Sequence, residues 1–253
     1  FCDDSKKQLP YGVTVMEWLP GAPLNYQRDM RTAAEILADI HSLKVPESTR
    51  IIRREAPAQG IYNECLAMAQ HYLEWDRADK RACGLIDTLI TETGGLPLKE
   101  TSGAPVCIVN TELNSGNFLI NPDGKSYLID WEKPLLSEPA QDLAHFLVPT
   151  TTFWKTDTIL TPEEIATFAN NYIAAVGDRM DTSTVRERLP LFFKVTCLRG
   201  ITWCAMAMRE YSEPGRALRN EITFKKIQEY LAPDFLSKIL DNYVRKDFLC
   251  GRA

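Results

Sequence analysis

The sequence predicts a mostly helical α+β fold. Apolar residues recur at three- and four-residue spacing over long stretches on both sides of a short central region, which is the period of amphipathic helices. The central region instead carries short apolar runs separated by turn residues, a pattern typical of strands. A composition of 45% apolar and 25% charged residues is that of a chain that folds around a core.

The first part of the chain reads as one strand followed by helices. Residues 12–17 are rich in β-branched side chains and predict a short strand. Apolar residues at helical spacing predict a helix over residues 28–42 and two more helices over residues 60–93. His41 lies beside the apolar face of the first helix, so we interpret it as a packed, hydrogen-bonded histidine rather than a catalytic one.

The central region predicts three strands, two of which form a hairpin. The strands are expected over residues 105–109, 118–121 and 126–130. Pro-Asp-Gly at 122–124 lies between the last two and favours a hairpin, because Asp and Gly tolerate the positive φ values of a tight turn. Antiparallel pairing then brings the start of one strand close to the end of the other.

The remainder of the chain predicts helices. Thr161 is expected to be the N-cap of one of them, with Pro at the first helical position and Glu164 completing a capping box. Gly177 is the expected end of that helix. Further helices are expected over residues 183–210, 215–231 and 233–246.

Charge and cysteine content exclude several classes of protein. The net charge of −5 argues against a nucleic-acid-binding protein and is compatible with a cationic small-molecule substrate. The seven cysteines are odd in number and form no C-x-x-C pair, so we expect reduced thiols, mostly in the core, in a cytoplasmic protein. The longest apolar stretch, residues 189–208, contains Lys194 and Arg199 and predicts a buried helix rather than a membrane span. The sequence does not determine the oligomeric state.

Three polar residues around the hairpin form a candidate site. Asn117 starts one strand and Asp130 ends the other, so their side-chain oxygens come together as ligands suited to Mg²⁺. Glu112 precedes them in a polar loop, where a carboxylate can accept a proton from an attacking hydroxyl. Each residue alone is more typical of a turn or a strand end, but together they match the needs of phosphoryl transfer.

The same residues resemble a known superfamily. Aminoglycoside phosphotransferases and choline kinases carry a loop H-G-D-x-x-x-x-N, then about a dozen residues later I-D-W/F, then a further Asp in the next helix. Asn117, Asp130 and Asp142 match this pattern in register. Met-Glu-Trp-Leu-Pro-Gly at 16–21 resembles the hinge between the two lobes of that superfamily, and Ile-His-Ser at 40–42 resembles the end of its L-x-x-L-H helix.

The resemblance implies the C-terminal lobe of a protein-kinase-like fold, with the hairpin carrying the active site. It implies transfer of a phosphoryl group from ATP or GTP, with Mg²⁺, to a hydroxyl of a small molecule. Asp142 is then expected to anchor the catalytic loop through backbone N–H groups, which is a structural role. The other implied site residues are Glu112 as the catalytic carboxylate, Asn117 and Asp130 as metal ligands, Glu17 and Leu19 as backbone partners of adenine, Met16 at the rear of its pocket, and Leu119 and Ile129 as its apolar floor.

Two departures from the superfamily pattern affect these expectations. Asn110 and Glu112 stand where the family has His and Asp, so a catalytically impaired nucleotide- or metabolite-binding pseudokinase is the alternative. Only residues 1–15 precede the hinge, and they contain no glycine-rich loop and no lysine at the usual distance. We therefore expect residues 1–21 to be the remnant of an N-terminal lobe and its hinge, with more of that lobe preceding Phe1 in the full protein. Residues 22–253 are the expected helical lobe.

Few residues in the sequence indicate which small molecule accepts the phosphoryl group. Glu132 could line an acidic acceptor site, and Trp154 could stack on a sugar or a cation. Aminoglycosides, amino alcohols, homoserine-like compounds and sugars all remain open as acceptors. A non-enzymatic interaction domain is a third possibility, and it predicts no metal binding at Asn117 and Asp130.

Overall fold

The structure is a computed structural model that describes residues 2–7, 9–100, 103–213 and 220–246. Its strands are β1 (Cys2–Asp3), β2 (Val13–Thr14), β3 (Ala22–Pro23), β4 (Ile52–Arg53), β5 (Cys107–Val109), β6 (Phe118–Ile120), β7 (Tyr127–Leu128) and β8 (Leu135–Ser137). Its α-helices are α1 (Met30–His41), α2 (Pro57–Leu73), α3 (Lys80–Gly94), α4 (Pro139–Leu147), α5 (Pro149–Lys155), α6 (Pro162–Val176), α7 (Val185–Ser212), α8 (Glu221–Leu231) and α9 (Pro233–Ile239). Short 3₁₀ turns lie at Ser115–Asn117 and Gly177–Arg179, and a π-helical turn lies at Leu240–Val244. The mostly helical α+β fold expected from the sequence is confirmed.

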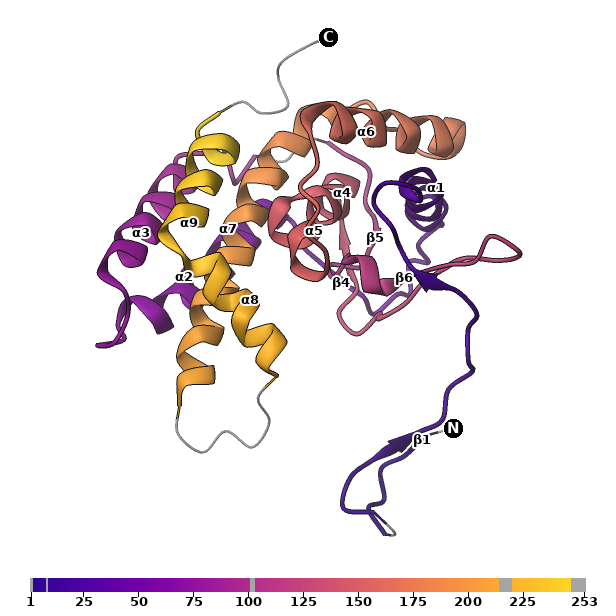
Figure 1. The fold of residues 1–253 in the computed structure, drawn as a ribbon. Helices are drawn as coiled ribbons and strands as arrows, with labels where there is room; N and C mark the ends of the chain where they lie inside the picture. Colours follow the sequence, from indigo (N-terminus) through magenta and orange to yellow (C-terminus); the bar gives the residue numbers. More distant parts are fainter. Residues whose placement is uncertain (1, 8, 101–102, 214–219, 247–253) are drawn as a thin grey trace.

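Helix α7 is the centre of the helical body. It packs against α2, α4 and α8, and Figure 1 shows it between α2 and α3 on one side and α4 and α5 on the other. Leu198 and Ile201 are fully buried along it. By length and apolar composition α7 could cross a membrane, but 67% of its most apolar window is buried inside the protein. The expectation of a buried helix over residues 189–208 is therefore confirmed.

Helix α6 begins and ends where the sequence predicts. Thr161 accepts a hydrogen bond from the backbone N–H of Glu164, and the Glu164 carboxylate accepts one from the Thr161 N–H, so the capping box is present. Gly177 follows α6 with φ of 54°, a value that favours glycine. The expected start of the helix over residues 215–231 lies outside the described residues, as does Cys250.

Two small sheets frame the central region. One has the order β3–β6–β7 and the other β4–β8–β5, in which β4 runs parallel to β8 and β5 antiparallel to it. Strands β3, β4 and β8 were not predicted, because each is only two or three residues long and is fixed by its pairing partner. The buried cysteines Cys65, Cys107, Cys197 and Cys204 are free thiols, and burial raises the pKa of each.

The predicted hairpin forms as β6 and β7, but its turn differs from the expected one. Phe118 pairs with Leu128 and Leu119 with Tyr127, which leaves residues 121–126 as the loop. The loop closes through the Gly124 N–H on the Asn121 carbonyl, 3.3 Å, and the Asn121 N–H on Ser126 Oγ, 3.0 Å. Positive φ at Asp and Gly, expected for a two-residue turn, is not needed by this longer loop and does not occur there.

The N-terminal strand is shorter than the sequence suggests. Only Val13 and Thr14 are paired, since the partner strand β1 has just two residues. Figure 1 shows this ribbon standing apart from the helical body, which begins at β3. The division into domains at residue 21 stays a prediction.

Two glycines in helices provide a matched test of packing. A Cβ at Gly200 in α7 would lie 2.5 Å from Cβ of Thr150 in α5, whereas a Cβ at Gly84 in α3 would meet nothing within 4 Å. Glycine in an open helix position costs about 0.5–1 kcal/mol relative to alanine. We therefore expect Gly84→Ala to raise the free energy of unfolding by about that amount and Gly200→Ala to lower it by about 1–3 kcal/mol. Urea denaturation measures both, and equal stabilisation by both substitutions would show that α5 and α7 can separate freely.

Candidate active site

The loop after β5 is held by one buried carboxylate. Asp142 lies in the first turn of α4 and is fully buried. Its Oδ2 accepts a hydrogen bond from the Asn110 N–H, 2.7 Å, and its Oδ1 one from the Thr111 N–H, 3.0 Å. His41 in α1 places Nε2 3.4 Å from the same carboxylate and Nδ1 2.9 Å from the Tyr172 hydroxyl. Two backbone donors and a histidine thus fix the loop to α4 and α1.

Asn110 joins this loop to the far end of the hairpin. Its side-chain Nδ2 donates to the Asp130 carbonyl, 3.0 Å, and its Oδ1 accepts from the Glu112 N–H, 3.0 Å. Thr111 and Asp130 both have positive φ, 73° and 63°, which is uncommon for non-glycine residues. Such conformations persist where surrounding contacts over-determine them, often at functional sites.

The two expected metal ligands lie at the same end of the hairpin. The Ile129 N–H donates to the Asn117 carbonyl, 2.9 Å, so Asp130 follows directly after the residue that pairs with Asn117. The Asn117 amide nitrogen donates to the Glu112 carbonyl, 2.5 Å, which leaves the amide oxygen as the group that can bind a cation. An amide oxygen and a carboxylate are hard ligands, so the residues present fit Mg²⁺.

Glu112 meets a partner that the sequence did not predict. Its Oε1 lies 3.2 Å from a guanidinium nitrogen of Arg199 in α7, and both side chains are half-buried. The ion pair fixes the carboxylate on the helical side of the loop. Next to it, the Leu113 N–H donates to Nδ1 of His145, 3.1 Å. Burial, reinforced by Arg199, lowers the pKa of His145 to about 3, so its ring is neutral with the proton on Nε2.

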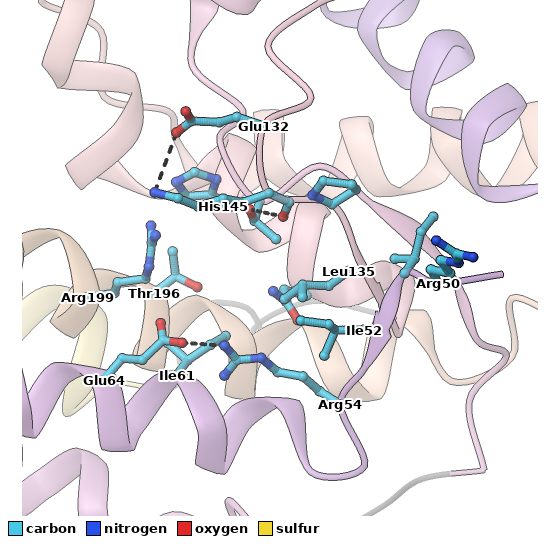
Figure 2. Close-up of a pocket in the computed structure, with 15 residues that line it drawn as sticks. Arg50, Ile52, Arg54, Ile61, Glu64, Glu132, Leu135, His145, Thr196 and Arg199 are labelled. Carbon is cyan, nitrogen blue, oxygen red and sulfur yellow. Dashed lines mark hydrogen bonds and ion pairs between the residues drawn. The ribbon is translucent and has the colours of Figure 1, made fainter.

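Two adjoining pockets open beside this loop. The smaller, about 140 Å³, is lined by Glu112 together with Trp154, Trp203 and Tyr230. The larger, about 620 Å³, is lined by Thr111 and Glu132 among others, and Figure 2 shows its walls. The residues common to both pockets are His145, Thr196 and Arg199. The structure therefore places the two candidate acceptor residues, Trp154 and Glu132, in different pockets.

The expected nucleotide-binding residues are only partly brought together. Leu119 and Ile129 are half-buried on the hairpin, and Leu119 pairs with Pro23 just after the hinge-like segment. Gly21, with φ of 143°, is needed there, since a Cβ would lie 3.0 Å from the Leu119 backbone. Met16, however, is 82% exposed and does not lie at the rear of a pocket. Residues 15–20 around it form no helix or strand, and no other element of the described residues covers its side chain.

The sequence matches the phosphotransferase enzyme family over residues 1–187, well over half of the chain. The chain belongs to this family. A comparison with curated proteins gives no match.

Several solved structures of small-molecule kinases and phosphotransferases are similar to this phosphotransferase-family chain. The choline kinase of Cryptosporidium parvum Iowa II has 14% identity and a TM-score of 0.58, over 94% of this chain and 74% of that chain. The Plasmodium vivax ethanolamine kinase has 15% identity and a TM-score of 0.55, over 88% and 65%. The AMP-bound spectinomycin phosphotransferase has 16% identity and a TM-score of 0.55, over 90% and 70%. These likenesses concern the fold, and the chain spans 65% of the length of the ethanolamine kinase.

Arg199 and His145 are the residues of this family member that the sequence did not single out. Arg199 had a visible signal, because a charge inside an otherwise apolar helix needs a partner when that helix is buried. His145 had none, since it is one of three histidines and its role depends on the backbone of a distant loop.

Proposed function

We propose that the chain takes part in transfer of a phosphoryl group from a nucleoside triphosphate, ATP or GTP, to a hydroxyl of a small molecule. Family membership supports phosphotransferase chemistry, and a spectinomycin phosphotransferase of similar fold is known with ADP and spectinomycin bound. The observation that carries the proposal is the hydrogen bonding that holds Glu112, Asn117 and Asp130 around one hairpin end. Asn110 bonds to the backbone of Glu112 and of Asp130, and Asn117 bonds to the Glu112 carbonyl. Because this chain spans only part of its relatives, the activity of the whole protein belongs to the proposal.

Each residue of the set has a defined part in that reaction. Asn117 and Asp130 would hold Mg²⁺, which neutralises phosphate charge when bound. Glu112 orients the acceptor hydroxyl and accepts its proton as the oxygen attacks phosphorus. Asp142 and Asn110 act through the backbone, by fixing the loop and the hairpin end at one relative position. Such positioning is the main contribution a protein makes to phosphoryl transfer.

A second candidate function is a nucleotide- or metabolite-binding pseudokinase. The Arg199–Glu112 ion pair favours it, because the guanidinium occupies one oxygen of the carboxylate that would receive the proton. Both functions need the metal ligands, but only the enzyme needs a free Glu112 oxygen. Measurement of ADP formation across a panel of hydroxyl acceptors separates them, since tight nucleotide binding without turnover on any acceptor identifies the pseudokinase.

The metal site has its own test. Asp130→Asn keeps a residue that tolerates positive φ but removes the charge, so we expect the affinity for Mn²⁺ in the presence of ATP to fall at least about tenfold. Electron paramagnetic resonance of free Mn²⁺ measures this affinity. Asp123→Asn makes the same change in the exposed loop of the same hairpin and should leave the affinity unchanged. Equal affinity in both variants would exclude Asp130 as a ligand and with it the proposed function.

A further inference from the structure

The larger pocket is lined by more cations than carboxylates, although the whole chain has a net charge of −5. Its cationic lining residues are Arg50, Arg54, Lys133 and Arg199, and its carboxylates are Glu64 and Glu132. In Figure 2 Glu132 lies at the top of the view, and Glu64 and Arg54 lie below it on the other side of the pocket. A pocket that accepts cationic substrates would show the opposite balance.

Both carboxylates of this pocket are already paired with its own cations. Glu64 forms an ion pair with Arg54, and Oε1 of Glu132 lies 3.5 Å from Nζ of Lys133. At the boundary of the two pockets Arg199 binds Glu112, 3.2 Å. Each of these carboxylates is therefore already partly neutralised by a neighbouring cation, and the excess positive charge of the lining favours an anionic ligand over a cationic one.

Among the described residues, Arg50 is the cation of this pocket lining that forms no ion pair. It is exposed at the pocket and makes no ion pair with any residue of the described ranges 2–7, 9–100, 103–213 and 220–246. Guanidinium groups bind carboxylates and phosphates through two parallel hydrogen bonds. Arg50 therefore offers an incoming anion a binding partner that costs no existing contact.

The neutral and apolar lining is consistent with the same kind of ligand. His145 uses Nδ1 to accept from the Leu113 N–H, so its remaining ring nitrogen is an N–H donor. Ile52, Ile61 and Leu135 form an apolar wall, and Ile52 is 68% exposed beside Arg50. A carbon skeleton can cover Ile52 while an oxygen-rich anionic group lies against the guanidinium.

We propose that the acceptor of this phosphotransferase is a hydroxyl compound that also carries an anionic group, a carboxylate or a phosphate, bound at Arg50 in the larger pocket. This inference rests on the proposed function and replaces the cationic acceptor that the net charge suggested. The acceptor hydroxyl oxygen forms a bond to the γ-phosphorus of the nucleoside triphosphate as the bond to the β-phosphate oxygen breaks. The hydroxyl proton passes to Glu112, and the products are a nucleoside diphosphate and a phosphate ester.

Calorimetric binding without nucleotide tests the inference independently of turnover. The probes are hydroxy acids and sugar phosphates, each beside an amino alcohol or neutral polyol of the same carbon number. We expect the anionic probes to bind and the amino alcohols not to bind. The comparison of hydroxy acids with sugar phosphates shows which anionic group is preferred.

Two neighbouring arginines supply the matched variants. Arg50→Gln should weaken binding of the anionic probes at least about tenfold, because a charged hydrogen-bond partner is lost. Arg53→Gln alters an exposed arginine on β4 that lines a different pocket and should leave binding unchanged. Preferential binding of amino alcohols, no binding of any anionic probe, or equal effects of both variants would overturn the inference.

The outcomes also separate this inference from the proposed function. Anionic probes that bind through Arg50 but accept no phosphoryl group would support the pocket assignment and contradict the enzyme. Turnover of an amino alcohol, with no binding of the anionic probes, would support the enzyme and overturn the anionic acceptor.

Discussion

Replacement of Glu112 by Gln is expected to lower kcat by about 10²–10⁴-fold, the usual contribution of a positioned general base. The amide is nearly isosteric and can keep one hydrogen bond to Arg199, but it cannot accept the hydroxyl proton. The KM for the nucleotide should change little, because the proposed metal ligands Asn117 and Asp130 are untouched. Steady-state kinetics on any acceptor that the wild-type protein uses measures both parameters.

Glu163→Gln is the control for this substitution. Glu163 is exposed in the first turn of α6 and lines neither of the two pockets beside the loop that follows β5. Its replacement should leave kcat within twofold of wild type, roughly the effect of a neutral surface change. An unchanged kcat in Glu112→Gln would show that another group receives the proton, or that none is needed in a loose transition state.

The ion pair with Arg199 fixes the position of the Glu112 carboxylate, which sits on a longer side chain than the aspartate of the family pattern. A glutamate reaches about one C–C bond further than an aspartate, and errors near 1 Å can lower rates about 10²-fold. Arg199 draws the carboxylate toward α7 and the smaller pocket, so the longer side chain is held in one place rather than extended along the loop. The substituted carboxylate and its arginine are therefore best understood as one unit.

Local sequence signals predicted the elements that local interactions determine. The capping box at Thr161 depends on residues three apart, and the β6–β7 hairpin on a few adjacent ones. The hairpin also explains why the amino-acid sequence alone was enough to place Asn117 and Asp130 together. In these cases the contacts that fix the conformation lie within the segment itself.

Contacts between distant segments account for what the sequence did not reveal. Glu112 and Arg199 are 87 residues apart, and no periodicity in either segment encodes their pairing. Strands β4 and β8 are parallel and come from segments separated by α2, α3 and the β6–β7 hairpin, so only the assembled fold aligns them. The positive φ at Asp130 was missed for the same reason, since Asn110 holds its carbonyl from another loop.

Loss of Arg188 is expected to have the largest effect on stability. Its guanidinium binds the Glu138 carboxylate through two hydrogen bonds, 2.8 and 2.7 Å, and both side chains are less than 9% exposed. Arg188→Met leaves the carboxylate buried without its partner, and such a change costs about 3–5 kcal/mol. For a chain of this size the melting temperature should fall by roughly 6–20 °C, measured by calorimetry or circular dichroism.

The loss of stability in Arg188→Met is expected to come from the unpaired buried charge of Glu138 rather than from the lost attraction between the two side chains. The double variant Glu138→Leu/Arg188→Met distinguishes these two causes. With both charges removed, an apolar pair of similar volume should recover most of the stability.

Arg31→Met removes one partner of an exposed pair with Glu35 in α1 and should change the free energy of unfolding by less than about 1 kcal/mol. If Arg188→Met is no more destabilising than Arg31→Met, the buried pair does not hold α4 against α7. If the pair does hold them, its loss should also lower activity, because Glu138 is the N-cap of the helix whose first turn carries Asp142.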